Sequence, residues 1–347
     1  MLGSEEEGVC PSASNLTVLL RGVRHLRNLG GACPWVTKAL VMLNKSLPKH
    51  PPLALENFVS QPDIKDKEAA VVAKLCPNLK KIHLERPEEN CQAFVPDALG
   101  ALLRLSDLKH VESLCVLSLD IIESMCCVRQ LLAAGSHLTE LTLMNVVRGP
   151  VELPYLAHFC PHLRKLCLRG FNLRKLAEGR DEYGTRKLRW DDGADKDDAQ
   201  GDMRDKSKKR FLWPSLQTLE LSPLLGGAVD RESLLEIVRG APNLRTLDVG
   251  TSASQLSDED VPALSPAGNK LVSLTLRRNA NMGEPLRLTG RAVLGLLERC
   301  SHLTTLGLLN DWSVSEAEQA ELRRHCTANN LRVSLLASRC GCSCANC

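Results

Sequence analysis

Hydrophobic residues along the chain recur in a six-residue phrase with apolar residues, mostly leucine, at its first, fourth and sixth positions. The clearest copy lies in residues 160–168, Cys-Pro-His-Leu-Arg-Lys-Leu-Cys-Leu, and residues 76–84, 241–249 and 300–308 repeat it closely. Looser copies begin at Leu114, Leu138, Leu216 and Leu271. Side chains alternate along an extended strand, so the last two apolar residues of each phrase are expected to face one side.

The spacing of these phrases predicts a repeat architecture. Their first apolar residues are separated by 35, 24, 25, 53, 28, 27 and 32 residues, near the period of about 20–29 residues that is typical of leucine-rich repeats. The interval of 53 predicts one degenerate or replaced repeat. One strand cannot bury its apolar face alone, so neighbours stack in parallel and are joined by helices. We therefore predict an α/β leucine-rich-repeat solenoid, a curved horseshoe with parallel strands inside and helices outside.

Helix signals precede several phrases. Asp230, Thr289 and Ser315 are N-cap candidates before apolar stripes, and Ser315 with Glu318 matches a capping box. A Leu288-Thr289 opening, a helix and then the Cys-Pro phrase together resemble the cysteine-containing leucine-rich repeats. Segments 257–264 and 288–300 resemble the helix-entry segment of that family.

Such repeats are typical of F-box/leucine-rich-repeat proteins, and the resemblance covers roughly residues 50–336. It implies a substrate-recognition subunit of an SCF-type ubiquitin ligase, with the SCF adaptor and cullin as partners. The F-box would lie within residues 1–50, but Leu47-Pro48 is followed by Lys-His-Pro-Pro, which disfavours the helix that opens that box. The alternative is a stand-alone leucine-rich-repeat regulatory binding module with no ubiquitin role.

The predicted domain organisation follows from these signals. Residues 1–50 are an N-terminal segment and residues 51–338 the repeat domain. Residues 16–20 and 36–43 are expected to form a worn strand and a helix of an early repeat. Leu53-Ala-Leu55 and Val333-Ser-Leu335 are candidate strand pairs at the two ends of the repeat set.

Two segments break the pattern. Residues 174–210 hold 12 Lys or Arg and 10 Asp or Glu, which predicts a solvated loop insertion. Within it, the basic run 206–210 is of the type that directs nuclear import. Residues 339–347 form a cysteine-rich tail. Four of its thiols are candidate ligands for Zn(II) or Cu(I), the alternative being a disordered tail prone to oxidation; they belong to Cys340, Cys342, Cys344 and Cys347.

Composition and motifs narrow the function classes. The net charge is +3 and aromatics make up 3% of the chain, which disfavours nucleic-acid and membrane partners. The acidic N-terminus lacks a signal-peptide core, and no apolar run has transmembrane length, so we expect a cytoplasmic protein, with the nucleus as the alternative. No hydrolase, NTPase, metalloprotease or kinase motif occurs, so no enzymatic activity is predicted.

Cys76, Cys160 and Cys300 share one position before a strand and are expected to be buried.

The candidate binding surface consists of the exposed positions of the strands, on the concave face. These positions form three columns of small, polar and mixed-charge residues, which suit a protein partner. The looser copy at Leu114 contributes Val116, Ser118 and Asp120 to the columns. The predicted protein-binding residues are Lys81, His83, Glu140, Thr142, Lys165, Arg169, Glu220, Asp248 and Arg277.

Overall fold

The computed structural model describes fifteen stretches of the chain, and all structural statements concern them: residues 12–23, 25–29, 35–60, 64–85, 111–117, 137–144, 150–151, 156–157, 160–173, 213–223, 229, 231–251, 256–265, 270–278 and 285–337. The predicted loop insertion at 174–210 and the cysteine-rich tail at 339–347 fall outside these residues. None of the described helices is both long and apolar enough to cross a membrane.

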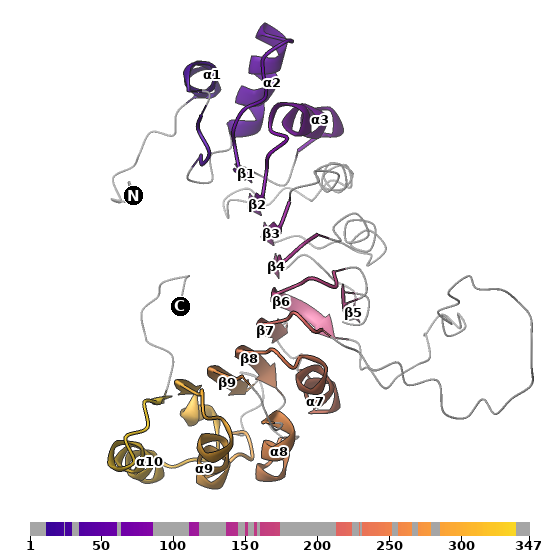
Figure 1. Ribbon diagram of the computed structural model, residues 1–347. Coiled ribbons are helices and arrows are strands. Elements are labelled where there is room, and N and C mark those ends of the chain that lie inside the picture. The colour runs from indigo at the N-terminus through magenta and orange to yellow at the C-terminus, as the bar shows by residue number, and fades with distance from the viewer. Residues whose placement is uncertain are drawn as a thin grey trace, which may run out of the picture.

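The described strands form one open parallel sheet in which neighbours follow in chain order (Figure 1). The short strand β5 (Pro150–Val151) pairs beside this path with the far end of β6. The main path runs through β1 (Asn57–Ser60), β2 (Lys81–Glu85), β3 (Ser113–Leu117), β4 (Glu140–Met144), β6 (Lys165–Leu173), β7 (Thr218–Pro223), β8 (Thr246–Thr251), β9 (Ser273–Arg278), β10 (Thr305–Gly307) and β11 (Ser334–Leu336). This order confirms the predicted α/β class with stacked parallel strands.

The helices lie along one side of this sheet. The strands line the inner side of an arc and the helices its outer side (Figure 1). The helices are α1 (Ala13–Gly22), α2 (Val36–Ser46), α3 (Asp66–Leu75), α7 (Arg231–Gly240), α8 (Val261–Leu264), α9 (Gly290–Arg299) and α10 (Glu316–Ala328), with the 3-10 helices η1 (Asp258–Asp260) and η2 (Leu309–Asp311).

The apolar residues at the fourth position of each phrase form a continuous row across the sheet. These residues pair strand to strand and are all buried, so the prediction that they share the core face is confirmed. The row is Phe58, Ile82, Leu114, Leu141, Leu166, Leu219, Leu247, Leu274 and Leu306.

A ladder of backbone hydrogen bonds runs along the edge where the strands begin. For β1 to β4 and β6 to β9, the carbonyl of the residue before the strand accepts two N–H groups from the next repeat, and the Arg27 carbonyl does the same. For example, the Gln217 carbonyl accepts from Arg245 at 2.8 Å and Thr246 at 2.9 Å. We call these residues the edge column: Arg27, Glu56, Lys80, Glu112, Thr139, Arg164, Gln217, Arg245 and Val272. Because each rung is a main-chain bond, it fixes the register whatever the side chain is.

The ladder begins before β1, within the segment where an early repeat is predicted. The Arg27 carbonyl accepts the N–H groups of Glu56 and Asn57 at 2.8 and 3.2 Å, and Asn28 bridges Asn57 in parallel. Helix α2 covers the predicted helix at 36–43. The strand predicted at 16–20 is wrong, because those residues lie in α1. Leu16 and Leu20 are buried four residues apart, as on one face of a helix.

The register of one other phrase also differs from the prediction. Leu114 pairs with Ile82 and Leu141, so it holds the fourth position and Val111 the first. The repeat starts are then 32 and 27 residues apart (111 − 79 and 138 − 111), in place of 35 and 24. A run of several apolar residues allows more than one phrase, and the main-chain pairing selects between them. The columns therefore contain Ser113 and Cys115, and the assignment of Val116 is wrong; Ser118 and Asp120 fall outside the described residues.

At the ends of the repeat set, neither candidate strand pair is confirmed as a pair. Leu335 lies in β11 and pairs with Leu306, so a strand is present there, but Val333 lies before that strand. Leu53 lies before β1, and its N–H donates to the Leu75 carbonyl at 2.7 Å, so Leu53 and Leu55 are not a strand pair.

Across the long interval, β6 pairs directly with β7, so no strand of an additional repeat separates them. The predicted caps Thr289 and Ser315 are confirmed. Asp230 falls outside the described residues.

Candidate protein-binding face

All nine predicted binding residues lie on strands of the sheet, at positions that alternate with the buried row. Lys81, Glu140 and Lys165 stand in one column, connected through Ser113. His83, Thr142, Glu220 and Asp248 stand in the next, connected through Cys115 and Cys167. Arg169 and Arg277 follow two residues further along their strands, in the third column.

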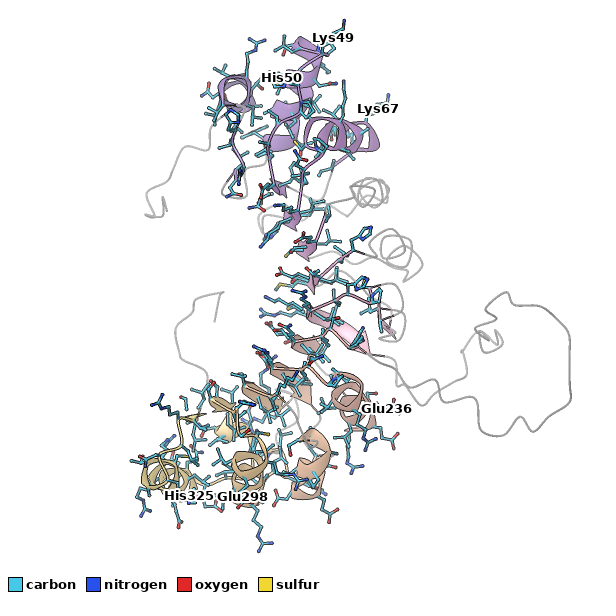
Figure 2. The ribbon with its side chains drawn as sticks, in the orientation of Figure 1. Lys49, His50, Lys67, Glu236, Glu298 and His325 are labelled. Carbon is cyan, nitrogen blue, oxygen red and sulfur yellow. The ribbon has the colours of Figure 1, made fainter. Side chains whose placement is uncertain are left out.

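Side chains on the strands project toward the inner side of the arc as well as toward the helices (Figure 2), and the alternate positions to the buried row face inward. Charged residues labelled on the helices, such as Lys67, Glu236 and Glu298, lie on its outer side (Figure 2). The predicted residues therefore share the concave face.

Salt bridges hold the charges of this face together over β6 to β9. Arg169 Nη2 lies 3.1 Å from Glu220 Oε2, and the Cys167 thiol donates to the same oxygen at 3.3 Å. Arg277 bonds Asp248 Oδ1 through Nε at 2.7 Å and the Ser222 hydroxyl through Nη2 at 2.7 Å. The Arg277 side chain is only 15% exposed, so this pair is shielded from solvent more than a typical surface ion pair. This half of the face is held in one arrangement before any partner binds.

The charged side chains over β2 to β6 have fewer partners than those over β6 to β9. Glu140 accepts a hydrogen bond from the Ser113 hydroxyl at 3.1 Å. Lys81 and Lys165 are exposed, and neither side chain is paired within the described part of the chain. Two free ammonium groups beside a fixed pair network can meet acidic groups of a protein partner.

The column positions continue from β10 into β11, where Ser334 pairs with Thr305 and Leu336 with Gly307. Gly307 occupies a column position, but it is buried, and a Cβ atom there would lie 2.7 Å from Leu336 Cβ in β11. The close approach of β11 therefore requires glycine at this position. Any larger side chain would have to displace β11.

The sequence did not reveal that the acidic residues of η1 connect three repeats through hydrogen bonds. Asp260 is 1% exposed, accepts from Arg231 Nε at 2.9 Å and accepts the Ser257 N–H at 3.0 Å. Asp258 accepts the N–H and hydroxyl of Thr289, the N-cap of α9, at 2.7 and 2.6 Å. The sequence predicts only a helix entry for the segment 257–264. Its acidic residues in fact tie the starts of α7 and α9 together, which no local pattern could show.

The thiols before the strands are buried, as predicted for Cys76, Cys160 and Cys300. Burial raises the pKa of the Cys76 and Cys160 thiols from 9.0 to about 12. Cys167 also reaches a pKa of about 12, through burial and the Glu220 carboxylate, with Arg169 acting in the opposite direction. These groups stay protonated near neutral pH, which makes them poor nucleophiles and poor metal ligands.

We expect Cys76 and Cys160 to react with iodoacetamide at pH 8 at least about a hundredfold more slowly in the folded chain than in urea. A pKa three units higher lowers the thiolate fraction about a thousandfold, and burial adds to this. Peptide mass spectrometry after timed quenching measures both rates. Equal rates in the two states would contradict this account. Because the folded pKa is the higher one, the associated stability is present below pH 9 and should be lost between pH 9 and 12.

The described residues contain no group of three or more His, Cys, Asp or Glu side chains placed to hold a metal ion. Cys340, Cys342, Cys344 and Cys347 fall outside them, so the zinc site remains a prediction.

Comparisons with known proteins do not assign the chain to a family. No model of a protein family matches the sequence, and no curated protein matches it either.

Proposed function

We propose that this protein is a recognition scaffold of the leucine-rich-repeat type, without enzymatic activity, whose concave strand face binds a protein partner. The observation that carries the proposal is the grouping of all nine predicted residues on one parallel sheet. The regular leucine row and the edge ladder support the repeat type. The face is polar and of mixed charge, with fixed pairs at one end and free lysines at the other, and such a surface suits a protein partner better than an apolar ligand.

Between the two roles considered from the sequence, the N-terminal helices favour the stand-alone module. The F-box was expected within residues 1–50. Among the described residues there, Arg27 lies between α1 and α2 on the same ladder as the later edge residues, which supports an early repeat. An early repeat at this place is what the module alternative predicts.

The SCF receptor role is the second candidate. Thr289 caps α9 and the buried Cys300 ends it, in the order that is typical of the cysteine-containing repeats.

We place the protein inside the cell, in the cytoplasm with the nucleus as alternative, because the six cysteines that the structure describes are free thiols.

Affinity capture of the tagged full-length chain, with mass spectrometry, tests the proposal. Reversing Lys81 and Lys165 together to glutamate should weaken retention of a specific partner about tenfold or more, because both ammonium groups are free to pair with it. Lys67→Glu, on the outer helix α3, is the matched control and should retain the partner. Equal retention by both variants would exclude the concave face as the binding surface. Recovery of the SCF adaptor and cullin with the wild-type chain would select the receptor role over the module.

A further inference from the structure

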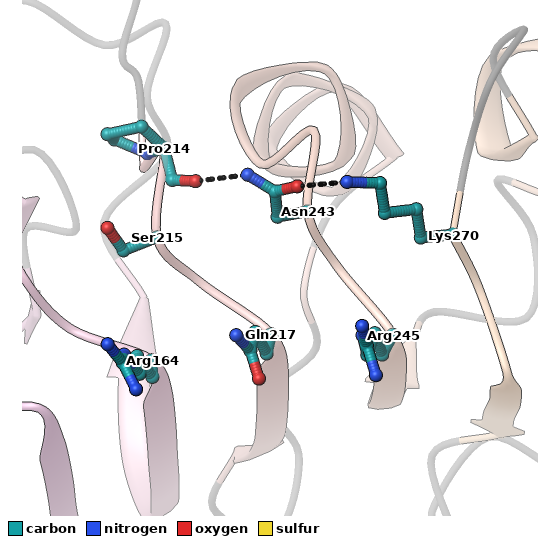
Figure 3. A pocket seen from close by; sticks show the side chains of 7 residues that line it. All are labelled: Arg164, Pro214, Ser215, Gln217, Asn243, Arg245 and Lys270. Carbon is teal, nitrogen blue, oxygen red and sulfur yellow. Dashed lines mark hydrogen bonds between the residues drawn. The ribbon is translucent and has the colours of Figure 1, made fainter.

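A polar cavity of about 400 Å³ opens at the edge of the sheet where β6, β7, β8 and β9 begin (Figure 3). Three of its lining residues are cationic, Arg164, Arg245 and Lys270, and none is acidic. Gln217 and Asn243 contribute side-chain amides. The cavity does not involve the nine residues of the concave face, so whatever binds here is separate from the partner proposed above.

The backbone places the two arginines on either side of Gln217. All three belong to the edge column: the Gln217 N–H donates to the Arg164 carbonyl at 2.8 Å, and the Arg245 N–H donates to the Gln217 carbonyl at 2.8 Å. Neighbouring strands lie about 4.8 Å apart, so the two arginines begin about two strand spacings from each other. Figure 3 shows Arg164, Gln217 and Arg245 in one row, with Pro214, Asn243 and Lys270 in a second row beside them and Ser215 below Pro214. Two guanidinium groups can thus approach one anion from opposite sides of the Gln217 amide.

The second row is already ordered. The Lys270 ammonium donates to Asn243 Oδ1 at 2.8 Å, and Asn243 Nδ2 donates to the Pro214 carbonyl at 2.6 Å. In contrast, the guanidinium groups of Arg164 and Arg245 make no hydrogen bond or ion pair with any group in the part of the chain that the structure describes. Both side chains are exposed, so a ligand can reach them.

The cations of the edge column have an acidic partner in its first half and none in its second half. Near its start, Glu56 lies 3.7 Å from Arg27 and 3.2 Å from Lys80, so one carboxylate serves both cations. From Thr139 onward the edge column holds no acid: Thr139, Arg164, Gln217, Arg245 and Val272. The first half supplies its own counter-charge, whereas the pocket supplies none.

We propose that this pocket binds a phosphate monoester group. Guanidinium forks match the oxygens of phosphate through paired hydrogen bonds, and two forks with an ammonium suit a dianion better than a single carboxylate. The volume lies near the lower end of the roughly 300–1,000 Å³ of small-molecule sites, so it holds the phosphate and part of the group that carries it. The polar walls exclude an apolar ligand. The carrier is either a free phosphorylated metabolite or a phosphorylated side chain, and the chemistry at the arginines is the same.

Isothermal titration of the full chain at constant ionic strength tests this. The probes are O-phosphoserine, inorganic phosphate, and a short phosphoserine peptide beside its unphosphorylated form. We expect saturable binding at one site, weakened about tenfold to a hundredfold by Arg164→Ala or Arg245→Ala. Arg245→Lys, which keeps the charge but loses the fork, should fall between. Arg291→Ala, an exposed arginine on α9, is the matched control and should bind like the wild type.

The proposal fails if O-phosphoserine and the phosphopeptide both bind without saturation, or if the double alanine variant binds them as the wild type does. It fails equally if Arg291→Ala weakens binding as much as the pocket variants, because that shows general charge attraction. Binding of the phosphopeptide at least about tenfold tighter than O-phosphoserine identifies a phosphorylated side chain as the carrier, and similar affinities identify a free phosphate ester. A negative result here leaves the concave-face proposal intact, since the two sites share no residue.

Discussion

Replacing Leu219 with alanine should lower the free energy of unfolding by about 2–5 kcal/mol. Leu219 is completely buried and pairs with Leu166 on one side and Leu247 on the other, in the middle of the leucine row. Its removal leaves a cavity that three neighbouring repeats line, and the main-chain ladder prevents the strands from closing it. Urea unfolding followed by circular dichroism measures the loss.

Thr218→Ala is the matched control for Leu219→Ala. Thr218 precedes Leu219 on the same strand but sits on the half-exposed concave side, so its truncation should stay within about 0.5 kcal/mol of the wild type. If the two variants unfolded at the same urea concentration, the row could not be the main source of cohesion between the repeats. Hydrogen exchange should also place the extra opening of Leu219→Ala in β6 to β8, because repeats couple mainly to their neighbours.

Truncating Trp312 to alanine should cost about 3–5 kcal/mol. The side chain is 2% exposed, and its indole N–H donates to the Leu276 carbonyl in β9 at 3.0 Å. Its backbone forms a parallel bridge with Leu286. Trp312 therefore joins the segment before α9, the strand β9 and the helix η2 at one point. Thermal and urea unfolding of the variant measure the effect.

A second substitution separates packing from the hydrogen bond. Trp312→Phe keeps most of the apolar contact but leaves the buried Leu276 carbonyl without this donor, so about 1–3 kcal/mol should be lost. Trp35→Ala is the control: Trp35 is 38% exposed and its ring contacts Lys38, whose Nζ lies 5.1 Å from the ring centroid. Its loss should cost about 1 kcal/mol or less, since an exposed cation–π contact is weak. A Trp312→Ala variant as stable as Trp35→Ala would contradict the bridging role.

Local chemistry was enough to predict the units of this fold. Alternation along a strand gave the buried row, and short side-chain oxygens before apolar stripes gave the caps at Thr289 and Ser315. These properties depend on residues a few positions apart, so the linear pattern contains them. The register of a strand, in contrast, depends on pairing with residues that are distant in the sequence. Leu114 and Leu53 were misplaced because several apolar residues stood within reach, and pairing with the next strand decided between them.

The sequence by itself determined the parallel repeat, the apolar face of each strand and the polar residues that share the concave face. Only the tertiary structure decided which charges meet. Arg27 and Lys80 share Glu56, while Arg164 and Arg245 flank Gln217 without an acid, although all four belong to the same edge column. Charge pairing depends on distances between residues tens of positions apart, which stacking sets and composition does not. The leucines therefore predict the arc, but the phosphate pocket could be found only from the neighbours that stacking creates.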